Sequence, residues 1–172
     1  MVLVRRLTVD DDAAYRTIRL AGLLDTPESF GSSYEEEVDF PLSRTADYLG
    51  GNFCFGAFDG DGNLCGTANF YVGGGLKTKH RGHVVAVYVD PKARGTRVGQ
   101  ALFAALIATA RHEVKQLHLV VTQSNEAALR LYQRVGFVIY GNDPRGIRVG
   151  DRYYDDYLMV LRLDEGGTES EE

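Results

Sequence analysis

One stretch constrains the fold of this chain more than any other. An apolar run at residues 84–89 is followed by a turn containing Gly and Arg and then by an Ala/Leu-rich segment. This order indicates a strand, a turn and a helix. The first N–H groups of a helix have no partners within it and lie at the positive end of its dipole. The turn at residues 94–99 therefore predicts a binding site for an anionic ligand.

The length and charge of the chain limit what it can be. Its 172 residues are enough to bury a substantial core. We expect one domain over residues 1–163 and an acidic, disordered tail at residues 164–172. The net charge of -5 argues against a nucleic-acid partner. No apolar run approaches the roughly 20 residues of a membrane helix, and no signal-peptide core is present, so we expect a cytoplasmic protein without membrane partners.

The two cysteines do not predict a disulfide or a metal site. Cys54 and Cys65 flank a predicted hairpin turn at residues 59–63. A tight turn there would place Cys54 opposite residues near Thr67 or Asn69, so we expect two reduced thiols. The turn begins like a calcium loop but lacks its glycine and final glutamate, and no Cys/His spacing suits zinc. We therefore expect no metal.

Strand and helix patterns alternate along the chain. Helix patterns begin after the acidic triplet at residues 10–12 and near residues 33, 97 and 125, whereas strand patterns cover residues 2–9, 53–58, 64–72, 84–89, 117–122, 137–140 and 153–163. A turn-rich segment around Pro144 separates the last two strands. The hairpin is antiparallel and the strand-helix-strand crossover is parallel, so the sheet is mixed. The fold class is α/β (α+β by some schemes), with six to seven strands and helices on both faces.

The turn at residues 94–99 does not match the common phosphate motifs. Gly99 is followed by Gln100 rather than the Lys-Ser/Thr of a P-loop, and only two of the three glycines of a dinucleotide site are present. The run Arg94-Gly95-Thr96-Arg97-Val98-Gly99 instead resembles the pyrophosphate loop of the GNAT superfamily, the acetyl-CoA-dependent N-acetyltransferases. Its pattern there is Gln/Arg-x-x-Gly-x-Gly/Ala. Arg97 replaces the middle glycine, and either it binds pyrophosphate through its guanidinium or it is a solvated first-turn residue.

A second segment carries the same resemblance. Residues 122–137 are similar to the second GNAT motif, with Asn125-x-x-Ala128, then Leu131-Tyr132, then Gly-Phe. Asn125 and Tyr132 are seven residues apart, so their side chains share one helix face. The resemblance implies that Asn125 helps to hold the cofactor and that Tyr132 is the general acid beside the CoA sulfur. Alternatively, Tyr132 is a half-buried aromatic residue of an amphipathic helix.

The resemblance also implies a GNAT-like fold and a set of ligand contacts. Backbone groups of Val87 and Val89 would bind the pantetheine arm, and a main-chain N–H there would polarise the thioester carbonyl. Phe30 and Tyr34 would line the acceptor pocket. The implied acetyl-CoA contacts are Val87, Tyr88, Val89, Arg94, Gly95, Thr96, Arg97, Val98, Gly99, Gln100, Asn125, Ala128 and Tyr132.

Acetylation of an amine also requires a base. An alkylamine titrates near the lysine value of about 10, so removing its proton near pH 7 costs roughly 3 pH units, or about 4 kcal/mol. We take Glu36 as the candidate base, while Glu35, Glu37, His83 and Tyr88 remain open. The run of three glutamates could equally be a solvated helix face.

These observations predict an N-acetyltransferase. It would transfer the acetyl group of acetyl-CoA to a primary amine of a small molecule or peptide by direct attack in a ternary complex. The alternative is a non-catalytic acyl-CoA binding module of the same fold. Binding of a nucleotide phosphate in the P-loop manner is disfavoured because the Lys-Ser/Thr pair is missing. The sequence leaves the acceptor open, and likewise whether the chain forms a homodimer.

Overall fold

A seven-stranded mixed sheet organises the described part of the chain. The structure, a computed structural model, describes residues 2–164. The spatial order is β1-β2-β3-β4-β5-β7-β6, and every neighbouring pair is antiparallel except β4 and β5. The strands are β1 (Leu3–Arg6), β2 (Phe53–Phe58), β3 (Leu64–Val72), β4 (Arg81–Val89), β5 (Gln116–Thr122), β6 (Val138–Val149) and β7 (Arg152–Arg162).

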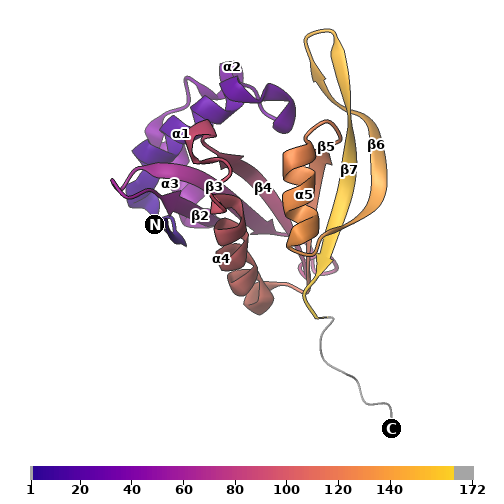
Figure 1. Cartoon of the computed structure of the whole chain (residues 1–172). Coiled ribbons are helices and arrows are strands. Elements are labelled where there is room, and N and C mark those ends of the chain that lie inside the picture. Colours follow the sequence, from indigo (N-terminus) through magenta and orange to yellow (C-terminus); the bar gives the residue numbers. More distant parts are fainter. Residues whose placement is uncertain (1, 165–172) are drawn as a thin grey trace.

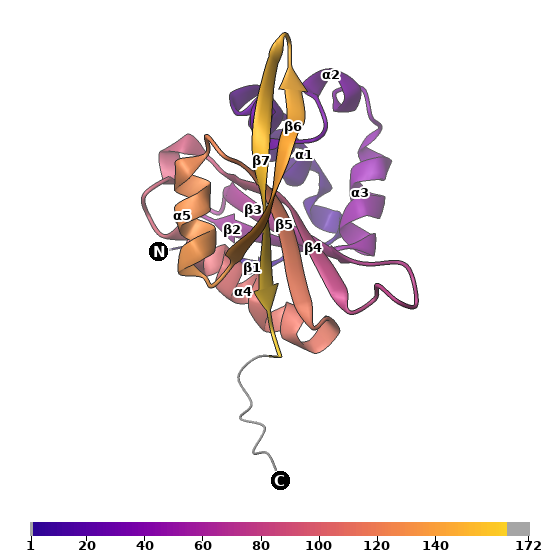
Figure 2. The same cartoon turned by 90° about the vertical axis from the view of Figure 1, so that its right-hand side faces the viewer.

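Helices cover both faces of this sheet, as predicted (Figures 1 and 2). The first three helices lie on one face, and α4 and α5 lie on the other. The helices are α1 (Asp12–Asp25), α2 (Tyr34–Glu37), α3 (Leu42–Gly51), α4 (Val98–Glu113) and α5 (Glu126–Arg134). Single 3-10 turns are η1 (Val9–Asp11), η2 (Pro27–Ser29) and η3 (Pro91–Ala93).

The main core lies between α4 and the sheet. Leu102, Phe103 and Leu106 of α4 are fully buried, and they belong to one cluster with Phe70 and Leu117 from the sheet. The apolar residues of α4 extend around most of the helix, which suits a helix that is covered on several sides. This packing fixes the N-terminus of α4 beside the end of β4.

The two parallel strands pair over only a short distance. Residues 81–83 of β4 pair with residues 116–118 of β5, and the ladder ends there. Further along β4, the register with β3 shifts between Thr67 and Asn69, and Ala86 has a φ of 54°. This is a β-bulge, in which an extra residue leaves the ladder and bends the strand. The strands that carry the predicted site are thus separated at their C-terminal ends.

Several sequence predictions are confirmed and others are wrong. Cys54 lies opposite Asn69, and both cysteines are free thiols. The segment around Pro144 is not a turn, because β6 continues through it to Val149. The irregular register between Asp143 and Ile147, on the edge strand of the sheet, accommodates a proline without a missing ladder donor. Helix α3 was not predicted, and residues 165–172 of the predicted tail lie outside the described residues.

The packing of α4 gives a first testable prediction. Leu102→Ala should lower the free energy of unfolding by about 2–5 kcal/mol, because it leaves a cavity between α4 and the sheet. Ala104 is exposed on the same helix, and Ala104→Ser should change stability by no more than about 0.5 kcal/mol. Urea unfolding monitored by circular dichroism measures both values. Equal effects of the two substitutions would contradict this account of the core.

Candidate functional site

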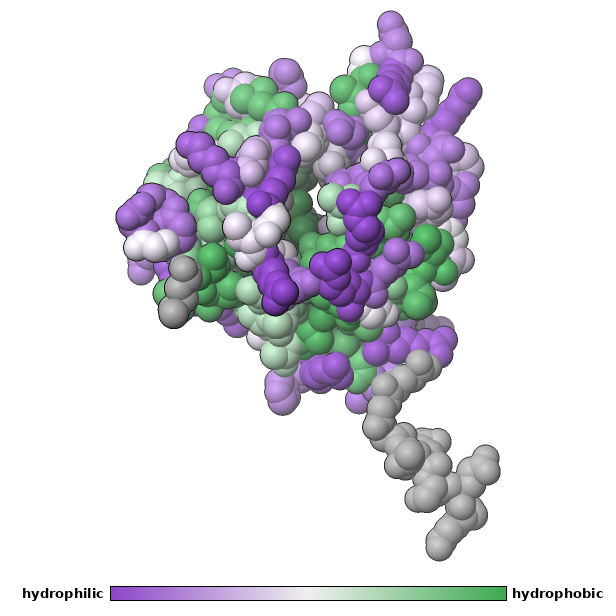
Figure 3. Space-filling model, in the orientation of Figure 1, coloured by the Kyte–Doolittle hydropathy of each residue, from purple (hydrophilic) through white to green (hydrophobic). Residues whose placement is uncertain are grey.

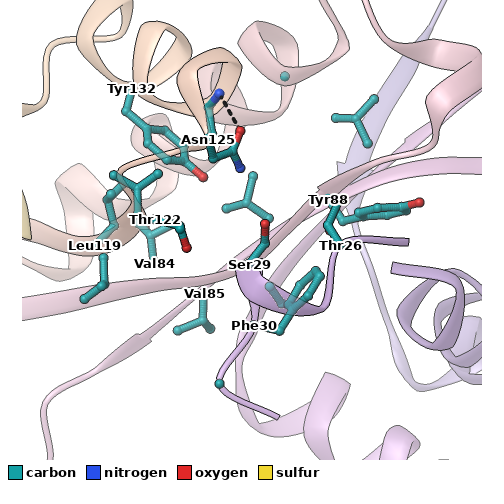
Figure 4. Close-up of a pocket in the computed structure, with 18 of the residues that line it drawn as sticks. Thr26, Ser29, Phe30, Val84, Val85, Tyr88, Leu119, Thr122, Asn125 and Tyr132 are labelled. Atoms are coloured by element: carbon teal, nitrogen blue, oxygen red, sulfur yellow. Dashed lines mark hydrogen bonds between the residues drawn. The ribbon is translucent and has the colours of Figure 1, made fainter. Parts of the chain in front are cut away.

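A cleft of about 1240 Å³ opens where β4 and β5 separate. Its walls come from β4, β5, η2 and the N-terminal ends of α4 and α5. Figure 3 shows the surface hollowed between these elements, and Figure 4 shows apolar and hydroxyl side chains pointing into the space. Val84, Val85, Leu119, Thr122 and Tyr132 are among them.

The predicted anion-binding turn has the required backbone shape despite its unusual residue. Arg97 is the N-cap of α4 and has φ 64° and ψ 17°, in the left-handed region. A glycine adopts this conformation freely, whereas another residue pays roughly 1–2 kcal/mol. The first bond of the helix runs from the N–H of Ala101 to the carbonyl of Arg97 at 3.1 Å. The N–H groups of residues 98–100 therefore precede the intrahelical ladder and can bind an anion.

Gly99 lets the two helices beside the cleft approach each other. A Cβ at this position would lie 2.7 Å from Cδ2 of Leu131 in α5, too close for a real contact. The glycine at the end of the loop pattern therefore serves packing of α4 against α5. It keeps the two helix N-termini on one wall of the cleft.

Arg94 points away from the first turn of α4 and ties the loop to α1. Its Nη2 lies 2.7 Å from Oδ2 of Asp25, and its Nε donates to the carbonyl of Val89 at 3.0 Å. The Arg94 guanidinium holds the pKa of Asp25 below its ordinary value. The Tyr88 hydroxyl donates to the same carboxylate oxygen at 3.0 Å. Burial and this hydrogen bond raise the pKa of Tyr88 to about 12, so Tyr88 is not a base near neutral pH.

Tyr132 and Asn125 both face the cleft, from the two ends of α5. The Tyr132 ring is 6% exposed and packs on Phe103 and Phe137, with ring centroids 5.4 and 6.2 Å away. Its hydroxyl points into the cleft (Figure 4), and burial raises its pKa, so it keeps its proton at neutral pH. Asn125 is the N-cap, and its Oδ1 accepts from the N–H of Ala128 at 3.2 Å. This leaves the Asn125 amide nitrogen for a ligand.

The bulge in β4 gives backbone groups to the same space. The register places Thr67 opposite Tyr88 and Asn69 opposite Val85, so Ala86 and Val87 both face Ala68. The Thr67 hydroxyl donates to the carbonyl of Ala86 at 3.0 Å and holds the bulge in place. One residue of a bulge is released from strand pairing, which makes its N–H available to a ligand.

Four of the predicted site residues lie off the cleft. The Glu36 carboxylate accepts from the N–H of Ser33 at 2.8 Å in a capping box at the start of α2, so it does not occupy the position of a base. Tyr34 packs against the cluster that contains Phe30, and Phe30 does line the cleft. Thr96 donates to the carbonyl of Ala93 and stabilises the turn. Glu35 also lies outside the lining residues.

The two other candidate bases that line the cleft, Glu37 and His83, differ in their contacts. Glu37 lines the cleft but forms a two-point ion pair with Arg19, at 2.9 and 3.0 Å. Burial acts to raise the Glu37 pKa, but the Arg19 hydrogen bonds and charge outweigh it and the net shift is downward. His83 also lines the cleft and stacks on Tyr71. Burial, with the charge of Arg81, lowers the His83 pKa, so its ring is neutral near pH 7.

Two cleft residues were missed by the sequence analysis. Asp156 is 4% exposed in β7, and its Oδ1 has no hydrogen-bond partner. His118 lies in β5 at the point where pairing with β4 ends. Its Nδ1 is 3.2 Å from the Arg81 guanidinium, which can only donate, so this nitrogen is the acceptor. Polar residues inside the otherwise apolar strands 117–122 and 153–163 were the available signal.

The model of the acetyltransferase (GNAT) family matches residues 20–137. The chain belongs to the GNAT family. The family's acyltransferase class and mixed α/β fold agree with the sequence resemblance. Within the described residues, no helix is long and apolar enough to cross a membrane, and no group of three metal-ligating side chains occurs.

Individual GNAT relatives match part of the chain. The L-amino acid N-acyltransferase MnaT of Escherichia coli is 38% identical over 82 residues, which cover 46% of this chain and 47% of MnaT. The N-terminal acetyltransferase complex ARD1 subunit homolog of Leishmania donovani is 31% identical over 96 residues, or 50% of this chain and 52% of that protein. The chain thus spans about half the length of these two curated relatives.

Solved GNAT structures share the fold over nearly the whole chain. A GNAT acetyltransferase of Streptococcus pneumoniae superposes with a TM-score of 0.85 at 22% identity, covering 94% of this chain and 99% of the other. Salmonella typhimurium yncA, solved with its cofactor acetyl-CoA, gives a TM-score of 0.83 at 24% identity, with coverage of 97% and 96%. At this identity the likeness shows the fold alone.

The GNAT family match ends at Phe137, before the β6–β7 hairpin. The matched part contains the anion-binding turn, the β4 bulge and Tyr132. The hairpin contributes further cleft residues, among them Asp143 and Asp156. Residues outside the family match therefore form part of the cleft wall.

His118 predicts a pH dependence of stability. Burial and the charge of Arg81 lower the His118 pKa to about 4, whereas in the unfolded chain it titrates near 6.5. The unfolded state therefore binds this proton first, and the fold loses stability as pH falls from about 6.5 to about 4. Urea midpoints should fall more steeply over this window for the wild type than for His118→Asn. His112→Asn, at an exposed site in α4, is the control, and parallel curves for wild type and His118→Asn would refute the prediction.

Proposed function

We propose that this chain transfers the acetyl group of acetyl-CoA to a primary amine of a small molecule or peptide, by direct attack in a ternary complex. One observation carries the proposal: the protonated Tyr132 hydroxyl and the N-terminus of α4 open into the same cleft, where β4 and β5 separate. A CoA thioester needs both an anion site and a proton donor for its sulfur.

Residues along the cleft provide a path for acetyl-CoA. The pyrophosphate would lie on the N–H groups of residues 98–100, with the guanidinium of Arg97 beside it. The pantetheine arm would run between β4 and α5, along Val87 and Val89 and past Asn125. This route ends at the β4 bulge, where a backbone N–H can bind the thioester oxygen.

The chemistry follows from these positions. The neutral amine attacks the thioester carbonyl, and the charge that develops on oxygen is stabilised by the backbone donor at the bulge. When the C–S bond breaks, the thiolate needs a proton. Tyr132 supplies it, because burial keeps its hydroxyl protonated and its ring is held by Phe103 and Phe137.

The names of the relatives narrow the choice of acceptors to test. MnaT is named for L-amino acids, and the Leishmania relative is named for protein N-termini. Both acceptors carry a primary amine next to a carboxyl or amide carbon. We therefore favour L-amino acids, amino-acid amides and short peptides with free N-termini as the first panel.

Acetyl-CoA should stabilise the protein and be consumed with an amine. At a concentration near 100 times its Kd it should add about 2.7 kcal/mol of stability, or about 5–10 °C in Tm. ATP with magnesium should add none. Release of the CoA thiol on addition of an acceptor from the panel measures turnover. Absence of stabilisation would refute the proposal, whereas stabilisation without turnover on any amine would favour a binding module.

Tyr132→Phe tests the acid within the same experiment. It should lower kcat by about 10²–10⁴-fold while acetyl-CoA still raises Tm, because only the proton donor is removed. Tyr153→Phe, at an exposed position of β7 outside the cleft lining, is the matched control. An unchanged kcat across pH in Tyr132→Phe would assign the proton to another donor.

Arg97 gives an independent prediction for the loop. Arg97→Ala and Arg97→Gly should both weaken acetyl-CoA binding by about 10- to 100-fold, since each removes a charge-assisted contact to pyrophosphate worth about 1.5–3 kcal/mol. Only Arg97→Gly relieves the left-handed backbone, so it should be the more stable of the two by about 1 kcal/mol. Calorimetric titration and urea unfolding measure these effects. Unchanged affinity in both variants would leave Arg97 as a solvated residue.

A further inference from the structure

Three oxygen-bearing side chains form a row across the β5, β7 and β6 strands. The register places Thr122 opposite Asp156, and Asp156 opposite Asp143. Directly opposed residues point to the same face of a sheet, and all three line the cleft. Asp143 and Asp156 lie on the β6–β7 hairpin, which the GNAT family model does not cover, whereas Thr122 lies within the matched residues.

Asp156 is a buried carboxylate without a compensating cation. It is 4% exposed, its Oδ1 has no partner, and it forms no ion pair among residues 2–164. The neighbouring charges that act on it, Asp143 and Asp155, are both negative. An unpaired buried carboxylate is costly unless a cation reaches it. The unpartnered Oδ1 at the wall of the cleft therefore indicates a cationic ligand there.

The immediate surroundings of Asp156 supply no cation to it. The single proton of the Thr122 hydroxyl is directed to the carbonyl of Glu28 in η2, at 2.8 Å. On the other side lies Gly146 of β6, where an added Cβ would overlap the Asp156 carboxylate. The polar and charged groups facing Asp156 are thus Thr122 and Glu28 on one side and Asp143 on the other, and none of them is a cation.

Strand alternation places Asp156 opposite the proton donor. Val121 packs in the cluster that contains Tyr132, on the α4–α5 side of the sheet. The next residue, Thr122, points to the other face, and Asp156 lies beside it. An amine held by Asp156 would therefore approach the thioester from the face opposite Tyr132. Attack and departure of the thiol would then occur on opposite sides.

We propose that Asp156 binds the ammonium group of the acceptor and takes its proton before the amine attacks acetyl-CoA. The inference rests on the proposed acetyltransferase function and names the acceptor class, a primary amine in its cationic form. Glu36 and Glu37 are occupied by a helix cap and by Arg19, whereas Oδ1 of Asp156 has no hydrogen-bond partner.

The protons and bonds balance in this scheme. The ammonium gives one proton to the Asp156 carboxylate, and the nitrogen lone pair forms the C–N bond as the carbonyl pair moves to oxygen. Re-forming the carbonyl breaks the C–S bond, and the thiolate takes the proton of Tyr132. The second nitrogen proton and the Asp156 proton pass to water, and water returns one proton to Tyr132. The products are the amide, the CoA thiol and one released proton.

Two small nucleophiles separate this role from a structural one. At pH 7 methylamine is a cation and must lose a proton, whereas hydroxylamine is neutral and needs no base before attack. Asp156→Asn should lower kcat/KM for methylamine by about 100-fold or more, and for hydroxylamine by only a few-fold. The enzyme-free rate with each nucleophile is subtracted. Asp151→Asn, at the fully exposed tip of the hairpin, should keep both activities.

Stability provides a readout that does not depend on turnover. Burial raises the pKa of Asp156, and the negative charges of Asp143 and Asp155 add to this shift. The folded state therefore loses stability as pH rises above the pKa of this carboxyl in the unfolded chain, which is about 4. Asp156→Asn removes this loss. Its urea midpoint should exceed that of the wild type at pH 7, and the difference should shrink as pH falls toward 3. A structural carboxylate would give the opposite sign at pH 7.

The outcomes are distinct. Selective loss of methylamine activity with a raised urea midpoint supports the proposal. Equal loss with both nucleophiles, no loss with either, or transfer by the wild type to hydroxylamine but not methylamine would overturn it. A wild type that acetyl-CoA fails to stabilise, and that releases no thiol with either nucleophile, would instead refute the acetyltransferase function itself.

Discussion

The hydrogen-bonded ladder between β4 and β5 ends at His83 and His118, and the cleft depends on this separation. Adjacent parallel strands normally form hydrogen bonds along their full length, because unpaired backbone groups are costly when buried. Here the unpaired ends instead line a space large enough for a ligand. The bulge at Ala86 directs backbone groups toward that space. The separated strand ends therefore leave backbone groups facing the cleft.

Packing on the α4 side compensates for the interrupted ladder. Leu102, Phe103 and Leu106 bury one continuous core against the strands, and Gly99 allows α5 to lie close beside α4. With both helices fixed, their N-termini and the Tyr132 hydroxyl hold set positions around the cleft. A loosely packed α4 would move the anion site relative to the proton donor. The stability of the core and the geometry of the site thus have the same physical origin.

The sequence revealed the parts of the site that are local along the chain. The loop at residues 94–99 and the motif around Tyr132 lie within short segments, so their residue types predict both structure and ligand. Asp156 and His118 depend on strand register across the sheet, which a single sequence does not show. The role of Glu36 as a helix cap could have been predicted from the sequence, because Ser33-x-x-Glu36 is a capping-box pattern. The predicted strand ended at residue 140, before Pro144, whereas β6 continues to Val149 because a proline is tolerated on an edge strand.

Burial gives the two proposed proton-transfer groups complementary roles. Tyr132 is buried against aromatic rings on the α4–α5 side, and loss of water favours its neutral form, which can donate. Asp156 is buried on the opposite face among other carboxylates, and the same loss of water makes its carboxylate a stronger base. The same physical effect thus yields an acid on one face and a base on the other, because burial favours the neutral form of each group: the phenol keeps its proton, and the carboxylate gains affinity for one. A thioester placed between them would receive its nucleophile and lose its thiol without either group changing position.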